Sequence, residues 1–220
     1  SSSAASDVYK RQVLAYDVGK GLRPLAGPDP NRLRTMAQWL TERLGNATQW
    51  PRDPDAAVAA IDALLERNLL EAPEQRKRIA LVLDYAQYLA PPGDAASAAR
   101  GAAARLVRML AWATNPLLRR VNVAIVLVTD SMAEMHPHLV TNPAVTTIDI
   151  PLPDAAERER FALAAATAAG LPAAQHDAVR RAAALSGGLS LESLRAVITM
   201  SVREGTAVDG PEFARMKKDL

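Results

Sequence analysis

The sequence predicts an α/β protein with a parallel sheet flanked by helices, followed by a small all-α domain. Two apolar runs, residues 79–83 and 121–128, support the sheet, and each leads into an aspartate, Asp84 and Asp130. A nearly continuous apolar run of strand length is typical of a strand buried on both faces of a parallel sheet. At Pro153 the pattern changes from mixed strands and helices to helices alone, which predicts the second domain.

The composition of the chain excludes several classes of function. The chain has 220 residues, of which 49% are hydrophobic and 23% are charged, and its net charge is +2. It contains no cysteine, which excludes disulfides, thiolate catalysis and cysteine metal sites. No stripe of basic residues indicates nucleic-acid binding. No apolar run approaches the roughly 20 residues that cross a bilayer, and no signal peptide is visible. We therefore expect a cytoplasmic protein without a membrane partner.

The first residues do not fit the pattern that follows. Residues 1–12 look like translated adapter or vector sequence, so we expect a non-native, disordered leader and a native reading from near Val13. A disordered native tail is the alternative. The predicted domains are then an α/β core over residues 13–152 and a helical domain over residues 153–220.

The elements are expected in a regular order. Residues 13–18 form a strand that ends near Asp17. Lys20 lies between two glycines, but the phosphate-loop pattern GxxxxGK followed by Ser or Thr is absent, so we expect a glycine-rich turn. Residues 146–150 alternate like a short strand. Helices are expected from Asn31 to about residue 44, after the Asp53 cap, over residues 94–114 and around residues 132–140. Further helices are expected over residues 154–170, where Asp154 and Glu157 come close to a capping box, over residues 173–185, after the Ser190 cap, and as a basic helix at the end of the chain.

Three of the predicted strands end near an aspartate, namely Asp17, Asp84 and Asp130. The carboxyl ends of parallel strands meet at one edge of a sheet, which is where open α/β sheets bind ligands. An acidic edge suits a metal ion that bridges to phosphate. Alternatively, each aspartate begins a turn or caps a helix. The alternative is favoured for any single aspartate, and the functional interpretation for Asp84 and Asp130 together.

Four segments together resemble the AAA+ family of P-loop ATPases. Residues 79–84 look like its Walker B strand, and residues 123–130 look like its sensor-one strand. Residues 148–158 resemble the junction between the ATPase core and its helical lid. Residues 187–194 resemble the turn that opens the lid helix facing the nucleotide. The likeness extends from about Val13 to the end of the chain.

The resemblance implies a function and a site. Asp84 would orient the Mg²⁺ of bound ATP, as catalytic residue and metal ligand, while Thr129 and Asp130 would help to place the attacking water. Gly188 and Arg195 would contact the nucleotide from the lid. The implied cofactors are ATP and Mg²⁺. The implied partners are a protein client of unknown identity and further copies of the chain, since rings of six are common in the family.

The sequence also departs from the family. The first strand and its phosphate-binding loop are absent, so the strands at Val13, 79 and 121 would be the second, third and fourth, and residues 146–150 the fifth. In the family the first strand lies between the fourth and the fifth. Tyr85 replaces the usual glutamate, and residues 138–143 lack the arginine that reaches a neighbour's site, a group worth about 10³–10⁵ in rate.

Three functions follow from these observations. The first is an AAA+ ATPase module that remodels a partner, for which this chain supplies the C-terminal part and is expected to be inactive alone. The second is a non-catalytic AAA+-like nucleotide switch or assembly subunit. The third, a phospho-acceptor receiver-like switch, ranks lowest, because such a switch needs an adjacent acidic pair and a lysine closing its last strand.

Overall fold

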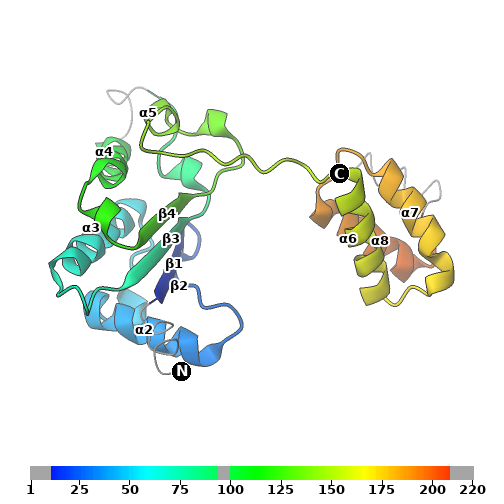
Figure 1. Ribbon diagram of the computed structural model, residues 1–220, viewed down its shortest axis with the longest axis horizontal. Helices are drawn as coiled ribbons and strands as arrows, with labels where there is room; N and C mark the ends of the chain where they lie inside the picture. The colour runs from blue at the N-terminus through cyan, green and yellow to red at the C-terminus, as the bar shows by residue number, and fades with distance from the viewer. Residues whose placement is uncertain (1–10, 94–99, 209–220) are drawn as a thin grey trace. The chain divides into compact units, whose positions relative to one another are not determined.

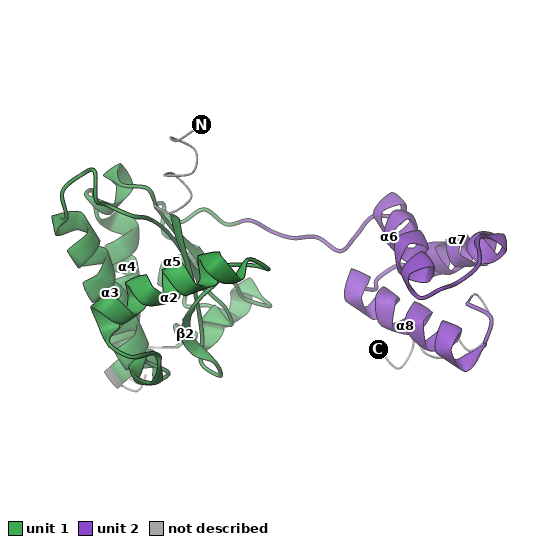
Figure 2. Ribbon diagram, turned by 90° about the horizontal axis from the view of Figure 1, so that it is seen from below, with its two compact units in different colours: residues 1–147 green, residues 148–220 purple. Residues whose placement is uncertain are grey.

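A computed structural model of the protein describes residues 11–93 and 100–208 (Figure 1). The chain divides into two compact units, Ser1–Thr147 and Ile148–Leu220 (Figure 2). This division falls shortly before Pro153, the residue at which the composition changes. Arg11 and Gln12, which the sequence assigns to the leader, belong to a strand of the first unit. The rest of that leader, residues 1–10, lies outside the described residues.

The first unit contains a four-stranded sheet in the order β2-β1-β3-β4. Strands β1, β3 and β4 are parallel, and β2 pairs with β1 as an antiparallel hairpin. The three parallel strands lie in the order expected for the strands at Val13, 79 and 121, whereas β2 was not predicted. The strands are β1 (Arg11–Asp17), β2 (Gly21–Pro24), β3 (Arg78–Leu83) and β4 (Val123–Leu127).

Helices join these strands and cover the sheet. Asp29 caps α2 with hydrogen bonds from the N–H groups of Asn31 and Arg32, so the cap lies two residues before the expected Asn31. Asp53 caps α3 as expected, by accepting from the N–H of Ala56. The helices of this unit are α2 (Pro30–Leu44), α3 (Pro54–Leu70), α4 (Arg100–Thr114) and α5 (Pro137–Val140). Short 3₁₀ turns are η1 (Ala47–Gln49), η2 (Ala86–Tyr88), η3 (Leu118–Arg120) and η4 (Met132–Glu134).

One face of the sheet packs against α3 and α4 (Figure 1). The pleat puts alternate residues of β3 on this face, and Leu81 and Leu83 are 1% and 0% exposed there. They belong to the same core cluster as Ile61 of α3 and Met109 of α4. The apolar side chains of the strands and of the helices therefore pack into one core, which holds the strand ends in place.

The other face of the sheet is covered less completely. Val126 of β4 is 47% exposed, and Val128 just beyond it is 42% exposed. In β3, buried residues alternate with half-buried ones. The expectation that both runs are buried on both faces is therefore wrong for the described residues. A continuous apolar run indicates that a strand could be buried on both faces. Whether it is buried depends on the helices or strands that pack against each face.

Residues 146–150, expected to form the fifth strand, form no strand. Ile148 and Ile150 are 81% and 87% exposed, although their alternation with polar residues is typical of a strand. The alternation indicates that the segment could form a strand, but a strand forms only when a neighbouring strand pairs with it through hydrogen bonds. Among the described residues β4 pairs only with β3. The resemblance implies that a further strand would lie between β4 and this segment.

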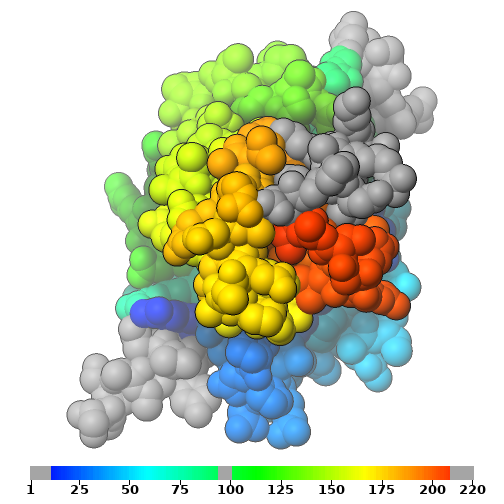
Figure 3. All heavy atoms as spheres, turned by 90° about the vertical axis from the view of Figure 1, so that its right-hand side faces the viewer, coloured from blue at the N-terminus to red at the C-terminus, as the bar shows by residue number. Residues whose placement is uncertain are grey.

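The second unit is a small helical domain, as predicted. Asp154 and Glu157 form the expected capping box of α6, and Ser190 caps α8. Buried alanines of α6 and α7, such as Ala162 and Ala182, pack against Leu194 and Ile198 of α8. Its elements are α6 (Ala155–Ala168), η5 (Ala173–Gln175), α7 (His176–Leu185) and α8 (Leu191–Glu204). Figure 3 shows a face of this unit on which α7 and α8 are visible.

Within residues 11–93 and 100–208, no helix combines the length and the hydropathy that are needed to span a membrane. The basic helix expected at the end of the chain falls among residues 209–220, outside the described residues.

Candidate functional site

Asp84 follows the last residue of β3 at the carboxyl edge of the sheet. Its N–H donates to the carbonyl oxygen of Tyr16 at 2.9 Å, which continues the pairing with β1 by one step. The side chain is partly exposed, and its Oδ1 accepts a hydrogen bond of 3.1 Å from the N–H of Tyr85. The backbone of Asp84 is therefore held by the sheet, while its carboxylate faces the turn that follows.

Thr129 and Asp130 follow β4 at the same edge of the sheet as Asp84. Two hydrogen bonds extend the pairing of β3 and β4 past their last residues: Val128 N–H donates to Leu83 O at 2.9 Å, and Ala86 N–H donates to Val128 O at 2.8 Å. Thr129 Oγ1 donates to the carbonyl oxygen of Ser131 at 3.0 Å. The structure thus brings the predicted catalytic residues of the first unit together at one edge.

Gln87 connects the two strand ends through its side chain. It lies in η2, is 6% exposed, and its Nε2 donates to Asp130 Oδ2 at 3.0 Å. Gln87 was not predicted as a site residue from the sequence. It lies three residues after Asp84, whereas the resemblance implies a glutamate directly after the aspartate. Only the pairing of β3 with β4 shows that it contacts Asp130.

The turn after Asp84 has an unusual backbone. Tyr85 adopts φ 52° and ψ 46°, in the left-handed region, and no other non-glycine residue within the described ranges has a positive φ. For a residue with a Cβ, this conformation costs about 1–2 kcal/mol. Tyr85 is 48% exposed, so much of it faces solvent.

Asp17 also ends a strand at this edge, but its carboxylate is used by the hairpin. Its Oδ1 accepts from the N–H groups of Gly19 and Lys20 at 3.0 and 2.7 Å, and its Oδ2 lies 2.7 Å from Arg23 Nη1. Burial by itself raises the pKa of Asp17, but the hydrogen bond from Lys20 and the Arg23 side chain outweigh it, so the pKa lies below its ordinary value. The interpretation that an aspartate begins a turn is therefore correct for Asp17, and the predicted glycine-rich turn around Lys20 is confirmed.

The side-chain oxygens at this edge are of the kind that bind a hard cation whose remaining ligands come from water or substrate. Asp84 and Asp130 offer carboxylate oxygens, and Thr129 offers a hydroxyl. Magnesium commonly binds through one or two carboxylates and completes its shell with waters and substrate phosphates. Within the described residues no group of three or more His, Cys, Asp or Glu side chains could hold a metal ion alone. The residues present therefore fit a metal that arrives with phosphate, not a closed protein cage.

The two predicted lid residues belong to the second unit. Gly188 lies in the turn between α7 and α8 with φ 88°, a conformation that favours glycine. Arg195 lies on α8, where its guanidinium is 5.0 Å from the centre of the Phe161 ring and its Nε is 3.5 Å from Glu192 Oε2. Both contacts of Arg195 are with residues of its own unit.

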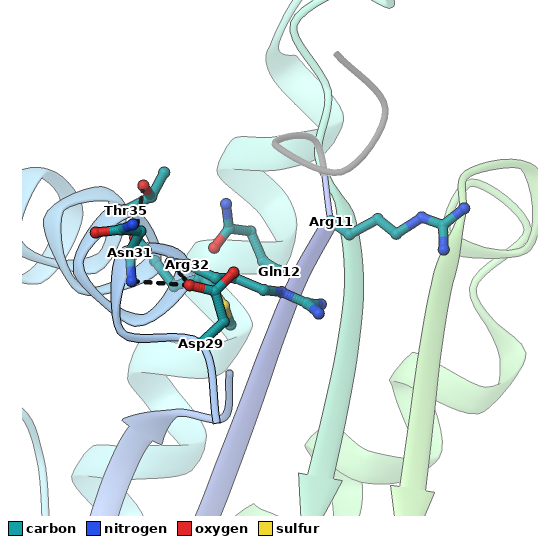
Figure 4. A pocket seen from close by; sticks show the side chains of 7 residues that line it. Arg11, Gln12, Asp29, Asn31, Arg32 and Thr35 are labelled. Carbon is teal, nitrogen blue, oxygen red and sulfur yellow. Dashed lines mark hydrogen bonds between the residues drawn. The ribbon is translucent and has the colours of Figure 1, made fainter. Parts of the chain in front are cut away.

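A small pocket lies at the opposite end of β1 (Figure 4). Its volume is about 100 Å³, and Gln12 is 2% exposed beside the capped start of α2. Oε1 of Gln12 and Nε of Arg32 are buried without a hydrogen-bond partner in the part of the chain that is described. None of the predicted site residues lines this pocket. Its lining residues are Arg11, Gln12, Asp29, Asn31, Arg32, Thr35 and Met36.

Comparison with known proteins places this fold in a family. The sequence model of the AAA+ chaperone N-terminal Rossmann-like domain matches residues 6–151, which include the whole described sheet. The chain belongs to this AAA+ family. The open α/β sheet of the first unit agrees with the Rossmann-like description of the family domain.

A solved structure has a similar fold over nearly the whole AAA+ chain. It is a chain of the complex described as HORMA:CdnC:Trip13 from E. coli MS115-1, with a TM-score of 0.58 and 17% sequence identity. The alignment covers 99% of this chain and 77% of that chain. At this identity the likeness concerns the fold alone. None of the curated proteins compared with the chain matches it.

Proposed function

We propose that this AAA+ chain forms part of an ATPase module that binds Mg-ATP at the carboxyl edge of its sheet and remodels a protein partner. One observation carries the proposal. Asp84 and Asp130 follow neighbouring parallel strands, and Gln87 in the turn after Asp84 donates a hydrogen bond to Asp130. Ligands of open α/β sheets bind at this edge.

Each residue would have a distinct role. Asp84 would hold Mg²⁺ on the phosphates, and Thr129 with Asp130 would orient the attacking water. Magnesium, when bound, neutralises negative charge on the phosphate oxygens. Gly188 and Arg195 would contact the nucleotide from the helical unit. Arg195 would first have to leave Glu192 or share its guanidinium with a phosphate.

The proposed ATPase module needs a phosphate-binding loop, and the GxxxxGK[ST] pattern of such a loop does not occur in this sequence. Among the described residues only β3 pairs with β4, and Val126 and Val128 are partly exposed, which is compatible with a further strand beside β4. We expect a GxxxxGK[ST] pattern about 20–40 residues before Val13 in the gene, after an apolar strand. An upstream reading frame without it would reject the proposed ATPase module.

The enzymatic test uses the protein expressed from its complete gene. Asp84→Ala is expected to lower Mg-dependent ATP turnover by about 10²–10³-fold, because it removes the metal ligand. Steady-state phosphate release measures the effect. The matched control is Asp149→Ala, since Asp149 is an exposed aspartate of the second unit. Turnover that survives Asp84→Ala would place the reaction elsewhere.

We propose a protein as the partner. The support is the AAA+ chaperone family match and the solved structure of similar fold, which is a complex with other proteins. Assembly into a ring, commonly of six copies in the family, belongs to the same proposal. Sedimentation of the complete protein with and without Mg-ATP tests the assembly, and a stable monomer under both conditions would contradict it.

The alternative is a nucleotide switch that binds ATP without turning it over. Tyr85 favours it, because its exposed ring stands where the family has a glutamate that polarises water. Nucleotide binding without phosphate release by the complete protein would support the switch. Turnover that is lost in Asp84→Ala would count against it.

A further inference from the structure

Gln87 is the buried polar side chain that joins the turn after β3 to the segment after β4. Its Nε2 donates to Asp130 Oδ2 at 3.0 Å, across 43 residues of sequence. Asp130 itself is exposed. The buried partner can therefore hold the exposed one in a single orientation.

The direction of the amide group is determined by its partner. A carboxylate oxygen can only accept a hydrogen bond, so the NH₂ group of Gln87 must face Asp130. Its Oε1 then points the other way, where it is buried and has no hydrogen-bond partner within the described part of the chain. An unpaired buried acceptor costs free energy, because it has lost its hydrogen bonds to water.

This cost shows that stability alone does not require glutamine here. Methionine has a similar length and volume and would fill the same space without an unpaired oxygen. What methionine cannot do is donate a hydrogen bond to Asp130. The property that distinguishes Gln87 is therefore its effect on the carboxylate, not its packing.

The backbone of the turn presents Gln87 to Asp130. Tyr85 is in the left-handed region with φ 52°, and the following N–H, that of Ala86, donates to Val128 O at 2.8 Å. The Tyr85 side chain thereby points to solvent, and Ala86 and Gln87 are buried. Strained backbone conformations of this kind are enriched at functional sites.

We propose that Gln87 is the positioning residue of this edge: it holds the carboxylate of Asp130 so that one oxygen remains free beside Asp84. The proposal rests on the function proposed above. Gln87 acts through Asp130, and its hydrogen bond takes up Oδ2 while Oδ1 stays available for a water or a metal-bound ligand. A neutral amide suits this role, since a second carboxylate at this distance would repel Asp130.

The test compares Gln87→Met with Tyr88→Phe, a control in the same 3₁₀ turn whose ring is 61% exposed. In Gln87→Met we expect Asp130 to sample several χ1 rotamers, measured by its Hα–Hβ three-bond couplings in NMR. Thermal unfolding is expected at or above the wild-type temperature. Tyr88→Phe is expected to keep one Asp130 rotamer. A single Asp130 rotamer in Gln87→Met would overturn the proposal, whatever its unfolding temperature.

Kinetics of the complete protein give the second readout. Gln87→Met is expected to lower kcat by about 10²-fold, with KM for ATP changed by less than about threefold, because misplacing a reacting group affects the reaction more than binding. A matching loss in Gln87→Leu, whose side chain also has no hydrogen-bond donor, would support the same conclusion. If Gln87→Met does not fold, Gln87→Leu carries both readouts, with the same outcomes expected.

The two proposals fail in different ways. If the complete wild-type protein neither binds nor hydrolyses Mg-ATP, the proposed function is wrong. The rotamer measurement on Asp130 still tests the Gln87 contact, because it needs no nucleotide. If the wild type hydrolyses ATP and Gln87→Met keeps its kcat, the positioning role is wrong and the proposed function stands.

Discussion

Tyr16 shows how a single buried residue reports on the first unit. Its ring is 0% exposed in the core, and its hydroxyl donates to the carbonyl oxygen of Arg52 at 2.9 Å. Burial, followed by the nearby charge of Asp53, raises the pKa of Tyr16 from 10.0 to about 12. The hydroxyl is therefore kept neutral in the folded state.

The raised pKa predicts a loss of stability at alkaline pH. Between about pH 10 and 12 the folded state holds a proton that the unfolded state has released, so stability falls as the pH rises through this range. Below pH 10 the contribution is complete. The loss is expected to approach about 2–3 kcal/mol at pH 12. Urea unfolding at stepped pH measures it, with Tyr16→Phe as the control that lacks the titrating group.

Tyr16→Phe has its own expected cost. It leaves the Arg52 carbonyl without its partner and should lower the free energy of unfolding at pH 7 by about 1 kcal/mol. Equal alkaline slopes in wild type and Tyr16→Phe would show that another group causes the pH dependence.

At the scale of the element, local signals at the helix ends were reliable. Asp53 and Asp154 cap α3 and α6 as the sequence predicts, because a cap depends on residues only a few positions apart. The strand predicted at residues 146–150 failed for the opposite reason. Its hydrogen-bond partners would have to come from a distant part of the chain, and none pairs with it among the described residues.

The capping box of α6 gives a prediction for the second unit. Asp154 Oδ1 accepts from the Glu157 N–H at 2.8 Å, and Glu157 Oε2 accepts from the Asp154 N–H at 3.0 Å. Asp154→Ala should lower the free energy of unfolding of this unit by about 1 kcal/mol, whereas Asp154→Asn keeps an acceptor and should cost less. Hydrogen exchange of the α6 amides measures both. Equal losses in the two variants would show that the hydrogen bond is not the main term.

At the scale of the whole molecule, the described residues form two hydrophobic cores that share no residue. One contains Leu81 and the sheet, and the other contains Ile198 and the helices of the second unit. Both side chains are almost fully buried, at 1% and 0% exposure. Each unit is thus expected to unfold with its own core.

Two matched substitutions test this. Leu81→Ala and Ile198→Ala should each cost about 2–5 kcal/mol in the unit that contains the residue and little in the other. Differential scanning calorimetry together with hydrogen exchange assigns each transition to a unit. If both substitutions lowered both transitions equally, the two cores would have to unfold as one cooperative body.

The sequence by itself determined the features that depend on neighbouring residues. These are the α/β class, the helical second unit, the helix caps and the aspartates that follow β3 and β4. Local propensity and periodicity specify such features, because each repeats over a few residues. The order of the three parallel strands was predicted from the family resemblance, which carries information about distant pairings.

Only the tertiary structure decided which distant residues meet. It placed Gln87 against Asp130, used Asp17 within the β1–β2 hairpin, and left Val126 exposed on a strand whose sequence predicts full burial. Each of these outcomes depends on partners that are far away in the sequence. The free energy of such contacts depends on which residues lie beside a strand in space, and the hydrophobic periodicity of the strand does not identify those residues.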